Sequence, residues 1–258
     1  MMTSSRMNIS HGSYVVEDTS RFGEITVQDT LVFVQKVSGL CLFGVFDGHM
    51  GDAVPKYIQS HLFDKELNEI QFWKEAKETM KRAFKCIKTS VHHNGKMGSA
   101  AMVVMNGKRF VAANVGDYKA ILSVDGMAIQ IGQKSPPTCN RPFSLNSITE
   151  FLHASGNCII ARTFGKQREE LEKNSSEPLV SDKKIDSHTE FIILASTGVW
   201  EVMRKQEAVN LIRHIEDAKE AAEWIAKEAV SRMSRGSISC LVIRFHKISA
   251  INLGTLSS

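Results

Sequence analysis

The chain has 258 residues, of which 43% are hydrophobic and 23% are charged, and its formal net charge is +4. This length allows one large hydrophobic core or two small ones, and the composition is that of an ordinary globular protein. Lys and Arg are scattered among Asp and Glu without a run of five like charges. Charge therefore gives no support to nucleic-acid binding or to binding at a membrane surface.

The cysteines and the apolar runs argue against a disulfide-rich, zinc-binding, membrane-spanning or secreted protein. The five cysteines are widely spaced and form no C-x-x-C pair, which favours reduced thiols over a disulfide framework or a zinc site. The longest apolar runs, such as LCLFGVF, are too short to cross a bilayer, and the N-terminal MMTSSRMNIS lacks the apolar region of a secretory signal. We therefore expect a cytoplasmic or nuclear protein with no nucleic-acid or membrane partner.

The first half of the chain predicts strands followed by two helices. The run CLFGVF is short and continuously apolar, which suits a strand buried on both faces. The segment that follows Gly51 has apolar residues at helical spacing, with Asp52 as the expected N-cap, and Trp73 is expected in the core. The expected elements are strands at 25–37 and 41–46 and helices at 52–63 and 71–92.

The second half predicts a strand meander, an irregular stretch and a closing α/β segment. Asn106-Gly107 and Asp125-Gly126 are strong hairpin signals between apolar runs. Trp224, at helical spacing, is expected in the core. The expected elements are strands at 100–105, 109–115, 119–124 and 127–131, an irregular stretch at 132–157, a strand at 157–161, a loop at 165–188, a strand at 191–195, helices at 207–215 and 218–230, and a last strand at 237–245. This order predicts a layered α+β sandwich.

Three acidic sites follow separate predicted strands. Asp47 ends the buried strand and precedes Gly48, the pair Glu17 and Asp18 follows a short apolar run, and Asp117 interrupts two strands. Each site alone is explained as well by an ordinary turn or a solvated pair. Together they could converge on a hard cation such as Mg²⁺ or Mn²⁺, which prefers oxygen ligands.

Several stretches together resemble one known family. VVED, FGVFDGHMGD, GSAA, VAANVGDYKA, TEFIILASTGVWEVM and ISCLVIRF, in this order, resemble the protein phosphatase 2C family of metal-dependent Ser/Thr phosphatases. The stretch GDAVPKYIQSHLF resembles a plant branch of it. The resemblance implies an α+β fold, a four-layer αββα sandwich in which helix pairs flank two antiparallel sheets. We expect this domain at 11–246, with tails at 1–10 and 247–258.

The resemblance also implies an active site in which two metal ions activate a bridging water. It assigns roles to six residues. The bridging carboxylate is Asp47, the carbonyl ligand is Gly48, the residues that hold metal-bound waters are Glu17 and Asp18, a weaker additional ion is held by Asp117, and the general acid is His49.

Two direct ligands of that family are missing from this chain. Where the family has A-S-D-G-L-W, this chain has ASTGVW, so Thr197 replaces a carboxylate. Where the family has Asp-Asn before its last strand, this chain has SRGS at 234–237, so Ser237 marks a second lost position and Arg235 adds a positive charge.

Four further departures from the family fall in the same site. They are Ala100 in place of Thr, Lys166 in place of an acid, the changed segment 134–136, and the lack of a basic residue in 12–16. Two divalent ions about 3.5–4 Å apart repel strongly and need several anionic oxygens. We therefore expect at most one weakly bound Mg²⁺ or Mn²⁺.

The leading hypothesis is a catalytically inactive pseudophosphatase, expected as a monomer, that binds a phosphoprotein or a protein kinase. The alternative is an active Mg²⁺/Mn²⁺-dependent protein Ser/Thr phosphatase with an altered site, in which Glu201 or Glu207 supplies a replacement ligand. A third possibility is a chain that folds but has no selected role. The irregular segments at 132–157 and 165–188 lie where the family varies its substrate flap, so they are candidates for partner choice.

Overall fold

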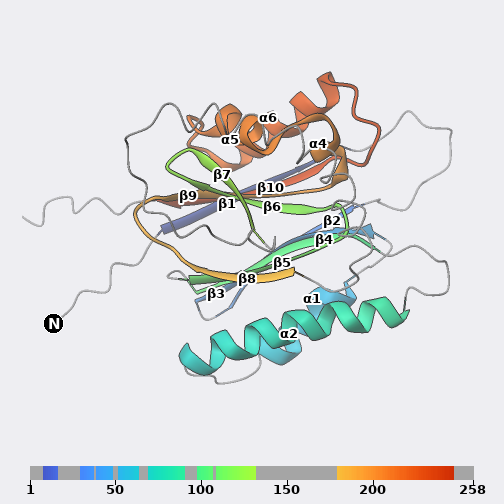
Figure 1. Cartoon of the computed structure of the whole chain (residues 1–258), viewed down its shortest axis with the longest axis vertical. Helices are drawn as coiled ribbons and strands as arrows, with labels where there is room; N and C mark the ends of the chain where they lie inside the picture. Colours follow the sequence, from blue (N-terminus) through green and yellow to red (C-terminus); the bar gives the residue numbers. More distant parts are fainter. Residues whose placement is uncertain are drawn as a thin grey trace, which may run out of the picture.

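The computed structural model describes residues 8–16, 30–37, 39–48, 52–63, 69–90, 98–106, 109–131 and 179–246. The strands are β1 (Asn8–Val15), β2 (Thr30–Val37), β3 (Leu40–Asp47), β4 (Ala100–Met105), β5 (Arg109–Val115), β6 (Lys119–Val124), β7 (Met127–Ile131), β8 (Leu179–Lys184), β9 (Thr189–Ala195) and β10 (Ser239–His246). The helices are α1 (Ala53–Ile58), continued by the π-helical turn η2 (Gln59–Phe63), α2 (Glu69–Ser90), α4 (Thr197–Val202), α5 (Lys205–Ile212) and α6 (Ala218–Ser231) (Figure 1).

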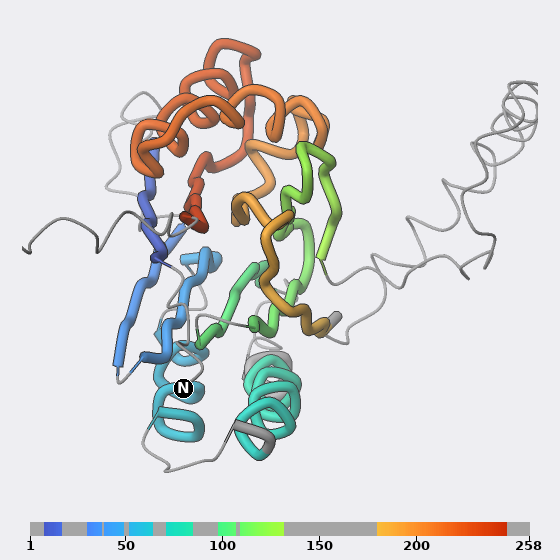
Figure 2. The backbone as a smooth tube through the Cα atoms, turned by 90° about the vertical axis from the view of Figure 1, so that its left-hand side faces the viewer, coloured from blue at the N-terminus to red at the C-terminus, as the bar shows by residue number. Residues whose placement is uncertain are grey.

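The described strands form two five-stranded sheets in which neighbouring strands are antiparallel. Sheet A has the order β1-β10-β9-β6-β7, and sheet B has the order β2-β3-β4-β5-β8. The two sheets are stacked, with α4, α5 and α6 over sheet A and α1 and α2 over sheet B (Figures 1 and 2). The expected αββα sandwich of two antiparallel sheets flanked by helices is confirmed.

Three layers of buried side chains hold these elements together. One fills the space between α1, α2 and sheet B, one lies between sheet A and its helices, and the third lies between the two sheets. Strand β9 shows why its sequence is continuously apolar. Phe191, Ile193 and Ala195 face the helices, whereas Ile192 and Leu194 face sheet B. Successive side chains of a strand point to opposite faces, so a strand between two apolar layers has no solvent side.

The expected meander at 100–131 is wrong, because the four strands do not share one sheet. β4 and β5 form a hairpin in sheet B, whereas β6 and β7 form a hairpin in sheet A. The chain passes from one sheet to the other at Gly116-Asp117, which is therefore not a hairpin turn. The second hairpin turn is confirmed at Asp125-Gly126, where φ is +49° and +76°, as the left-handed two-residue turn requires.

Three further expectations need correction. The loop expected at 165–188 contains strand β8, which pairs with β5 although four of its six residues are polar or charged. Asp52 occupies the N-cap position of α1 but makes no side-chain cap, because its carboxylate pairs with Lys56 at 2.6 Å instead. Trp73 is buried as expected, but Trp224 is 50% exposed.

At the edge of sheet B, ion pairs add to the pairing of β8 with β5 and to the packing of Val180. Asp182 of β8 accepts a hydrogen bond from Arg109 of β5 at 2.8 Å and also pairs with Lys77 of α2. Hydrogen bonding from Lys77, the largest cause, and from Arg109 lowers the pKa of this carboxyl, against the opposing effect of its partial burial. A hydrophobic pattern does not reveal a strand of this kind.

Several bounds differ slightly from the sequence expectation. β1 starts at Asn8, three residues before the expected domain boundary, and pairs with β10 through His246. The expected strand at 157–161 lies outside the described residues.

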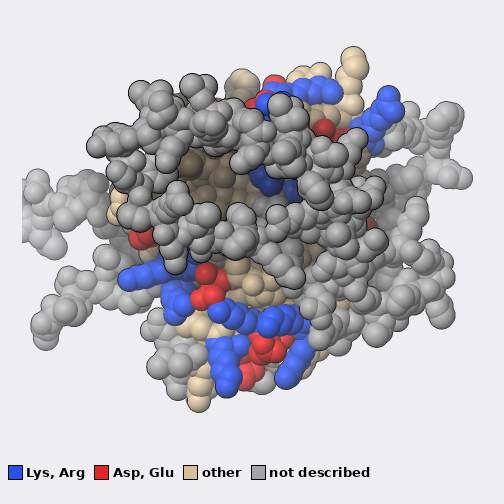
Figure 3. Space-filling model, in the orientation of Figure 1, with Lys and Arg blue, Asp and Glu red and all other residues tan. Residues whose placement is uncertain are grey.

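No helix in the described part of the chain is long and apolar enough to cross a membrane. On the face seen in Figure 3, blue Lys and Arg side chains are interspersed with red Asp and Glu.

Candidate functional site

The acidic strand ends and the lost ligand positions meet at one end of the sandwich. At this end the chain passes directly from β5 of sheet B to β6 of sheet A, so the ends of strands from both sheets lie here. In sheet A, the first residue of β6 lies beside Ala195 at the end of β9, and Ala195 lies beside Cys240 near the start of β10. In sheet B, the last residue of β5 lies beside Ala100, and Ala100 lies beside Phe46, just before Asp47.

On the sheet B side, Ser99 links two of the predicted acidic positions. The half-buried Asp47 donates its backbone N–H to the Ser99 carbonyl oxygen at 2.8 Å. The N–H of the exposed Asp117 donates to the Ser99 hydroxyl at 3.2 Å. Gly116, at φ +66°, leaves room for this hydroxyl, because a Cβ there would lie 2.3 Å from it. Gly48 follows Asp47 and is also half-buried.

On the sheet A side, the two lost ligand positions are neighbours. Thr197 is the half-buried first residue of α4. The buried Ser196 before it donates its hydroxyl to the Ser237 carbonyl oxygen at 2.6 Å and accepts from the Ser239 N–H at 2.9 Å. The Gly198 N–H, after it, donates to the same Ser237 oxygen at 3.3 Å. The start of α4 is therefore joined directly to the segment that precedes β10.

Two glycines allow this close approach of backbones. A Cβ on Gly198 would lie 2.6 Å from the carbonyl oxygens of Gly236 and Ser237, and a Cβ on Gly236 would lie 3.1 Å from Gly198 Cα. The first distance, 2.6 Å, is shorter than Cβ atoms approach other atoms in proteins, so a side chain at Gly198 would force these segments apart. The two segments touch through backbone atoms at the place where the resemblance puts two carboxylates.

Glu201, one of the two candidate replacement ligands, is engaged by the same segment. Its Oε1 accepts from the Ser234 hydroxyl at 2.7 Å and from the N–H groups of Arg235 and Gly236 at 2.6 and 2.8 Å. The hydrogen bond from Ser234, followed by that from the Gly236 N–H, lowers the pKa of the Glu201 carboxyl. An oxygen with three donors around it is poorly placed to bind a cation as well.

Glu207, the other candidate, is engaged in a different contact. Its Oε2 accepts from the Arg204 N–H at 2.9 Å, which caps α5, and from Arg232 Nη1 at 3.1 Å. Arg232 also donates to Glu228 at 2.8 Å and to the Val202 carbonyl oxygen at 3.0 Å. Glu207 therefore ties α5 to the end of α6.

The remaining predicted site residues, Glu17, Asp18 and His49, lie outside the described residues. Val16, next to this pair, is described, and its N–H donates to the Ile238 carbonyl oxygen at 2.9 Å. Within the described ranges, no three His, Cys, Asp or Glu side chains are grouped so that they could hold a metal ion.

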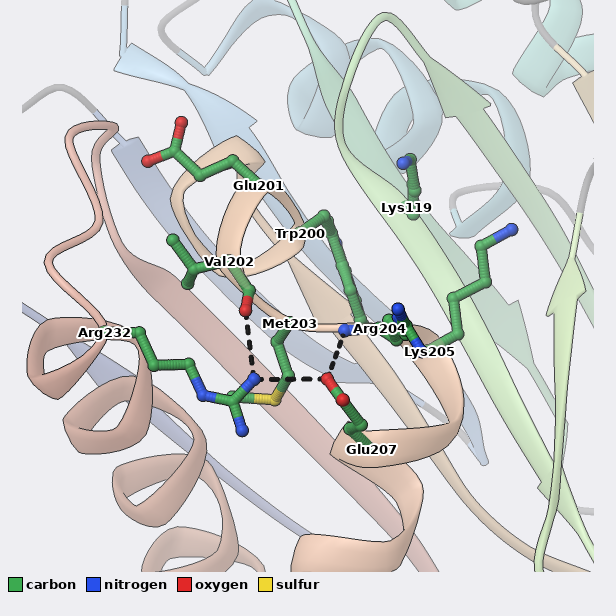
Figure 4. A pocket seen from close by; sticks show the side chains of 9 residues that line it. All are labelled: Lys119, Trp200, Glu201, Val202, Met203, Arg204, Lys205, Glu207 and Arg232. Atoms are coloured by element: carbon green, nitrogen blue, oxygen red, sulfur yellow. Dashed lines mark hydrogen bonds and ion pairs between the residues drawn. The ribbon is translucent and has the colours of Figure 1, made fainter. Parts of the chain in front are cut away.

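An open cavity of about 590 Å³ lies next to α4 (Figure 4). Lys119 of β6, Trp200 of α4 and the start of α5 at Arg204 and Lys205 contribute to its lining. The half-buried Trp200 is fixed by a 2.9 Å hydrogen bond from its Nε1 to the Ala195 carbonyl oxygen.

Comparison with known proteins agrees with this architecture. The family model of protein phosphatase 2C matches residues 24–141 and 151–238. The chain belongs to the protein phosphatase 2C family. Protein phosphatase 2C-like protein 44 of Arabidopsis thaliana is 42% identical over 243 residues, which cover 92% of this chain and 86% of the relative. Protein phosphatase 2C 58 of the same plant is 36% identical over 255 residues, covering 93% and 89%.

Solved structures of this family share the fold. The catalytic domain of the serine/threonine protein phosphatase PstP, in complex with two manganese ions, gives a TM-score of 0.59 at 14% identity and covers 93% of this chain and 99% of that chain. A bacterial serine phosphatase with an R161A mutation gives a TM-score of 0.62 at 11% identity, covering 93% and 100%. The expected membership of a plant-like protein phosphatase 2C branch is confirmed.

Three contributors to the site were not predicted as such from the sequence. Ser99 and Ser196 act through hydrogen bonds to segments 18 and 43 residues away, and Glu201 binds a segment 33 to 35 residues away. The nearby glycines, Gly98 directly before Ser99 and Gly198 two residues after Ser196, were a local signal that backbones come close here.

Proposed function

We propose that this chain is a catalytically inactive member of the protein phosphatase 2C family that acts by binding a phosphoprotein or a protein kinase. The observation that carries the proposal is the junction of Thr197 with the 234–237 segment. Both positions that the family fills with carboxylates lie in this junction, and neither holds an acid.

The donor set supports at most one weakly bound Mg²⁺ or Mn²⁺. Asp47 and the Gly48 carbonyl, with Glu17 and Asp18, remain for one ion, for which oxygen ligands suffice. On the other side a neutral Thr197 hydroxyl replaces a carboxylate, and the Ser237 carbonyl oxygen already accepts two hydrogen bonds. A second adjacent divalent ion therefore does not fit, since the repulsion between the ions is uncompensated there.

The alternative, an active enzyme with replacement ligands, would require Glu201 or Glu207 to leave its present partners. Releasing Glu201 would leave three donors of the 234–236 segment without their acceptor. Releasing Glu207 would separate it from Arg232 and from the cap of α5. The loss of these contacts argues against this second function.

The proposal also includes that the protein is a monomer located in the cytoplasm or nucleus.

The deciding experiment is hydrolysis of p-nitrophenyl phosphate and of a phosphothreonine peptide in excess Mn²⁺. We expect no turnover above that of Asp47→Ala, because without a pair of ions no bridged hydroxide forms. An active protein phosphatase 2C prepared in parallel serves as the positive control. Turnover by the wild-type chain that Asp47→Ala abolishes would establish the alternative.

A further inference from the structure

The open cavity beside α4 is lined by elements distant in sequence. It lies where β6, α4, the start of α5 and the residue after α6 meet, and its volume is about 590 Å³. Cavities of 300–1,000 Å³ are typical of sites that hold a small molecule or a side chain with its neighbours. This one is therefore larger than a bare inorganic anion needs.

The lining of the cavity has more cations than carboxylates. Its charged residues are the four cations Lys119, Arg204, Lys205 and Arg232 and the two carboxylates Glu201 and Glu207. Arg232 is offset by Glu207 and Glu228, with which it forms ion pairs at 3.1 and 2.8 Å. Glu201 directs its carboxylate to the 234–236 segment, and Figure 4 shows it pointing away from Lys119 and Lys205.

Lys119, Arg204 and Lys205 are the lining cations that a ligand in the cavity would contact. The Lys119 backbone belongs to the β6–β9 ladder, but its side chain makes no ion pair or hydrogen bond with any residue in the described part of the chain. The Arg204 guanidinium acts on Glu207 through its charge and forms no close ion pair there. In Figure 4 the Lys119 and Lys205 side chains lie on the same side of Trp200. Arg204 and Lys205 also begin α5, and the N-terminal end of a helix favours negative charge.

These features suit one ligand chemistry. A phosphate ester on a Ser or Thr side chain carries a charge of about −1.5 to −2 and three strong acceptor oxygens, and clustered Arg and Lys recognise it by charge-assisted hydrogen bonds. The half-buried Trp200 ring offers an apolar surface for the rest of the residue, and the remaining volume admits its neighbours. We propose that this cavity, formed by Lys119, Trp200, Arg204 and Lys205, binds a phosphorylated Ser or Thr side chain of the partner. The proposal rests on the phosphoprotein-binding function above and assigns a site to it.

The test is a fluorescence-anisotropy titration of the full chain with a fluorescein-labelled phosphothreonine peptide that has alanine and glycine flanks. EDTA is present so that no metal ion can capture the phosphate. The same peptide without phosphate, and with glutamate in place of phosphothreonine, tests whether the phosphate or negative charge alone is recognised. We expect the phosphopeptide to bind at least about tenfold more tightly than either, since charge-assisted hydrogen bonds contribute more than neutral ones.

Two variants locate the binding. Lys119→Ala and Arg204→Ala should each weaken phosphopeptide binding by about tenfold, and the double variant should bind it no better than the unphosphorylated peptide. The matched control is Lys74→Ala, an exposed cation on α2, on the opposite side of the sandwich. It should bind like the wild type. Thermal unfolding of each variant, monitored by circular dichroism, verifies that it is folded.

The indole of Trp200 gives a second readout that does not depend on these variants. In Trp224→Phe, which lacks the exposed indole of α6, the phosphopeptide should still change the intrinsic fluorescence, because Trp73 is buried elsewhere and Trp200 lines the cavity. An unchanged emission on saturation, or equal phosphopeptide affinity of Lys119→Ala, Arg204→Ala and the wild type, would overturn the assignment of this cavity. Equal affinity for the phosphorylated and glutamate peptides would overturn the phosphate chemistry.

These outcomes are separate from those of the hydrolysis assay. If the phosphopeptide binds but the cavity variants bind it equally well, the proposed function stands and only its site is wrong. If Mn²⁺ produces turnover, catalytic inactivity is refuted, while the titration in EDTA still reports on the cavity. No binding of the phosphopeptide at all would overturn the cavity proposal without bearing on catalysis.

Discussion

Glu201 is the residue that ties together the two segments in which the metal-binding carboxylates are missing, α4 and 234–236. Its carboxylate accepts hydrogen bonds from Ser234, Arg235 and Gly236, at the place where the family uses an acidic residue for metal binding. One negative charge at the surface thus accepts three hydrogen bonds from the 234–236 segment. The interaction is between partly exposed groups, so its contribution to stability is modest.

Replacing this charge tests the contact. We expect Glu201→Gln to lower the free energy of unfolding by about 1 kcal/mol at neutral pH, because hydrogen bonds to a charged acceptor are weakened but not all lost. The pKa of Glu201 is lowered in the folded state, so its stabilisation is present above the unfolded carboxyl pKa, roughly 4.3, and is lost as the pH falls through the lower folded value.

Urea denaturation at a series of pH values measures both effects. The difference between wild type and Glu201→Gln should be full near neutral pH and shrink in acid below about pH 4.3, the unfolded carboxyl pKa. The control is Glu78→Gln, whose exposed partner Lys81 lies one helical turn away at 3.1 Å and whose loss should cost about 0.5 kcal/mol or less. A difference that grows on acidification would contradict the account.

At the scale of elements, α6 packs closely against β1 at Gly12. A Cβ on the buried Gly12 would lie 2.2 Å from Lys219 N and 2.3 Å from Lys219 Cα. Both atoms belong to the helix backbone, so no side-chain rotation could relieve the clash. The glycine lets the first turn of α6 rest on the edge strand of sheet A.

Gly12→Ala should therefore displace α6 and destabilise the protein by about 2–3 kcal/mol, the usual cost of an overpacked core position. The control is Ser13→Ala, the next residue of β1, whose side chain points to the opposite face and whose change should cost less than about 1 kcal/mol. Urea denaturation midpoints give both values. Equal stability of the two variants would show that α6 is not seated on Gly12.

At the scale of the whole molecule, the end of the sandwich is closed by hydrogen bonds of the protein itself. Ser196, Gly198 and Glu201 join α4 to the 234–239 segment, and Ser99 joins the end of β3 to the crossing between the sheets. None of these contacts needs an ion. A fold stabilised in this way should depend little on divalent cations.

Adding Mn²⁺ to the metal-free protein should accordingly raise its stability only slightly. One ion at a concentration equal to its dissociation constant contributes about 0.4 kcal/mol, whereas each ion of a tight pair at a hundredfold excess would contribute about 2.7 kcal/mol. Thermal unfolding with and without Mn²⁺, together with calorimetric titration, distinguishes these cases. Two tight sites in the titration would refute the single weak site.

Restoring the lost ligands provides the converse measurement. Thr197→Asp alone should raise Mn²⁺ affinity without producing turnover, because the second carboxylate is still missing. Adding Gly236→Asp and Ser237→Asn builds the Asp-Asn pair before Ile238, although a Cβ at Gly236 would lie 3.1 Å from Gly198 Cα and the contact must adjust by a few tenths of an ångström. Full activity from Thr197→Asp by itself would show that the 234–237 segment lost nothing essential.

The sequence by itself determined the elements whose signals are local. Continuous apolar runs predicted β3 and β9, and turn pairs predicted the two hairpins, because side-chain period and turn chemistry depend only on near neighbours. The motif order placed Asp47, Asp117, Thr197 and Ser237 at one site, and the structure brings their strand ends to one end of the sandwich.

Only the tertiary structure decided which segments meet. It divided the expected meander between two sheets, made a charged segment into β8 through Asp182, and joined Glu201 to the 234–236 segment. It also formed the cavity of Lys119, Trp200 and Arg204 from three separate elements. These contacts join residues from 33 to 85 positions apart, and the packing of whole layers, which no local pattern encodes, determines which of them form.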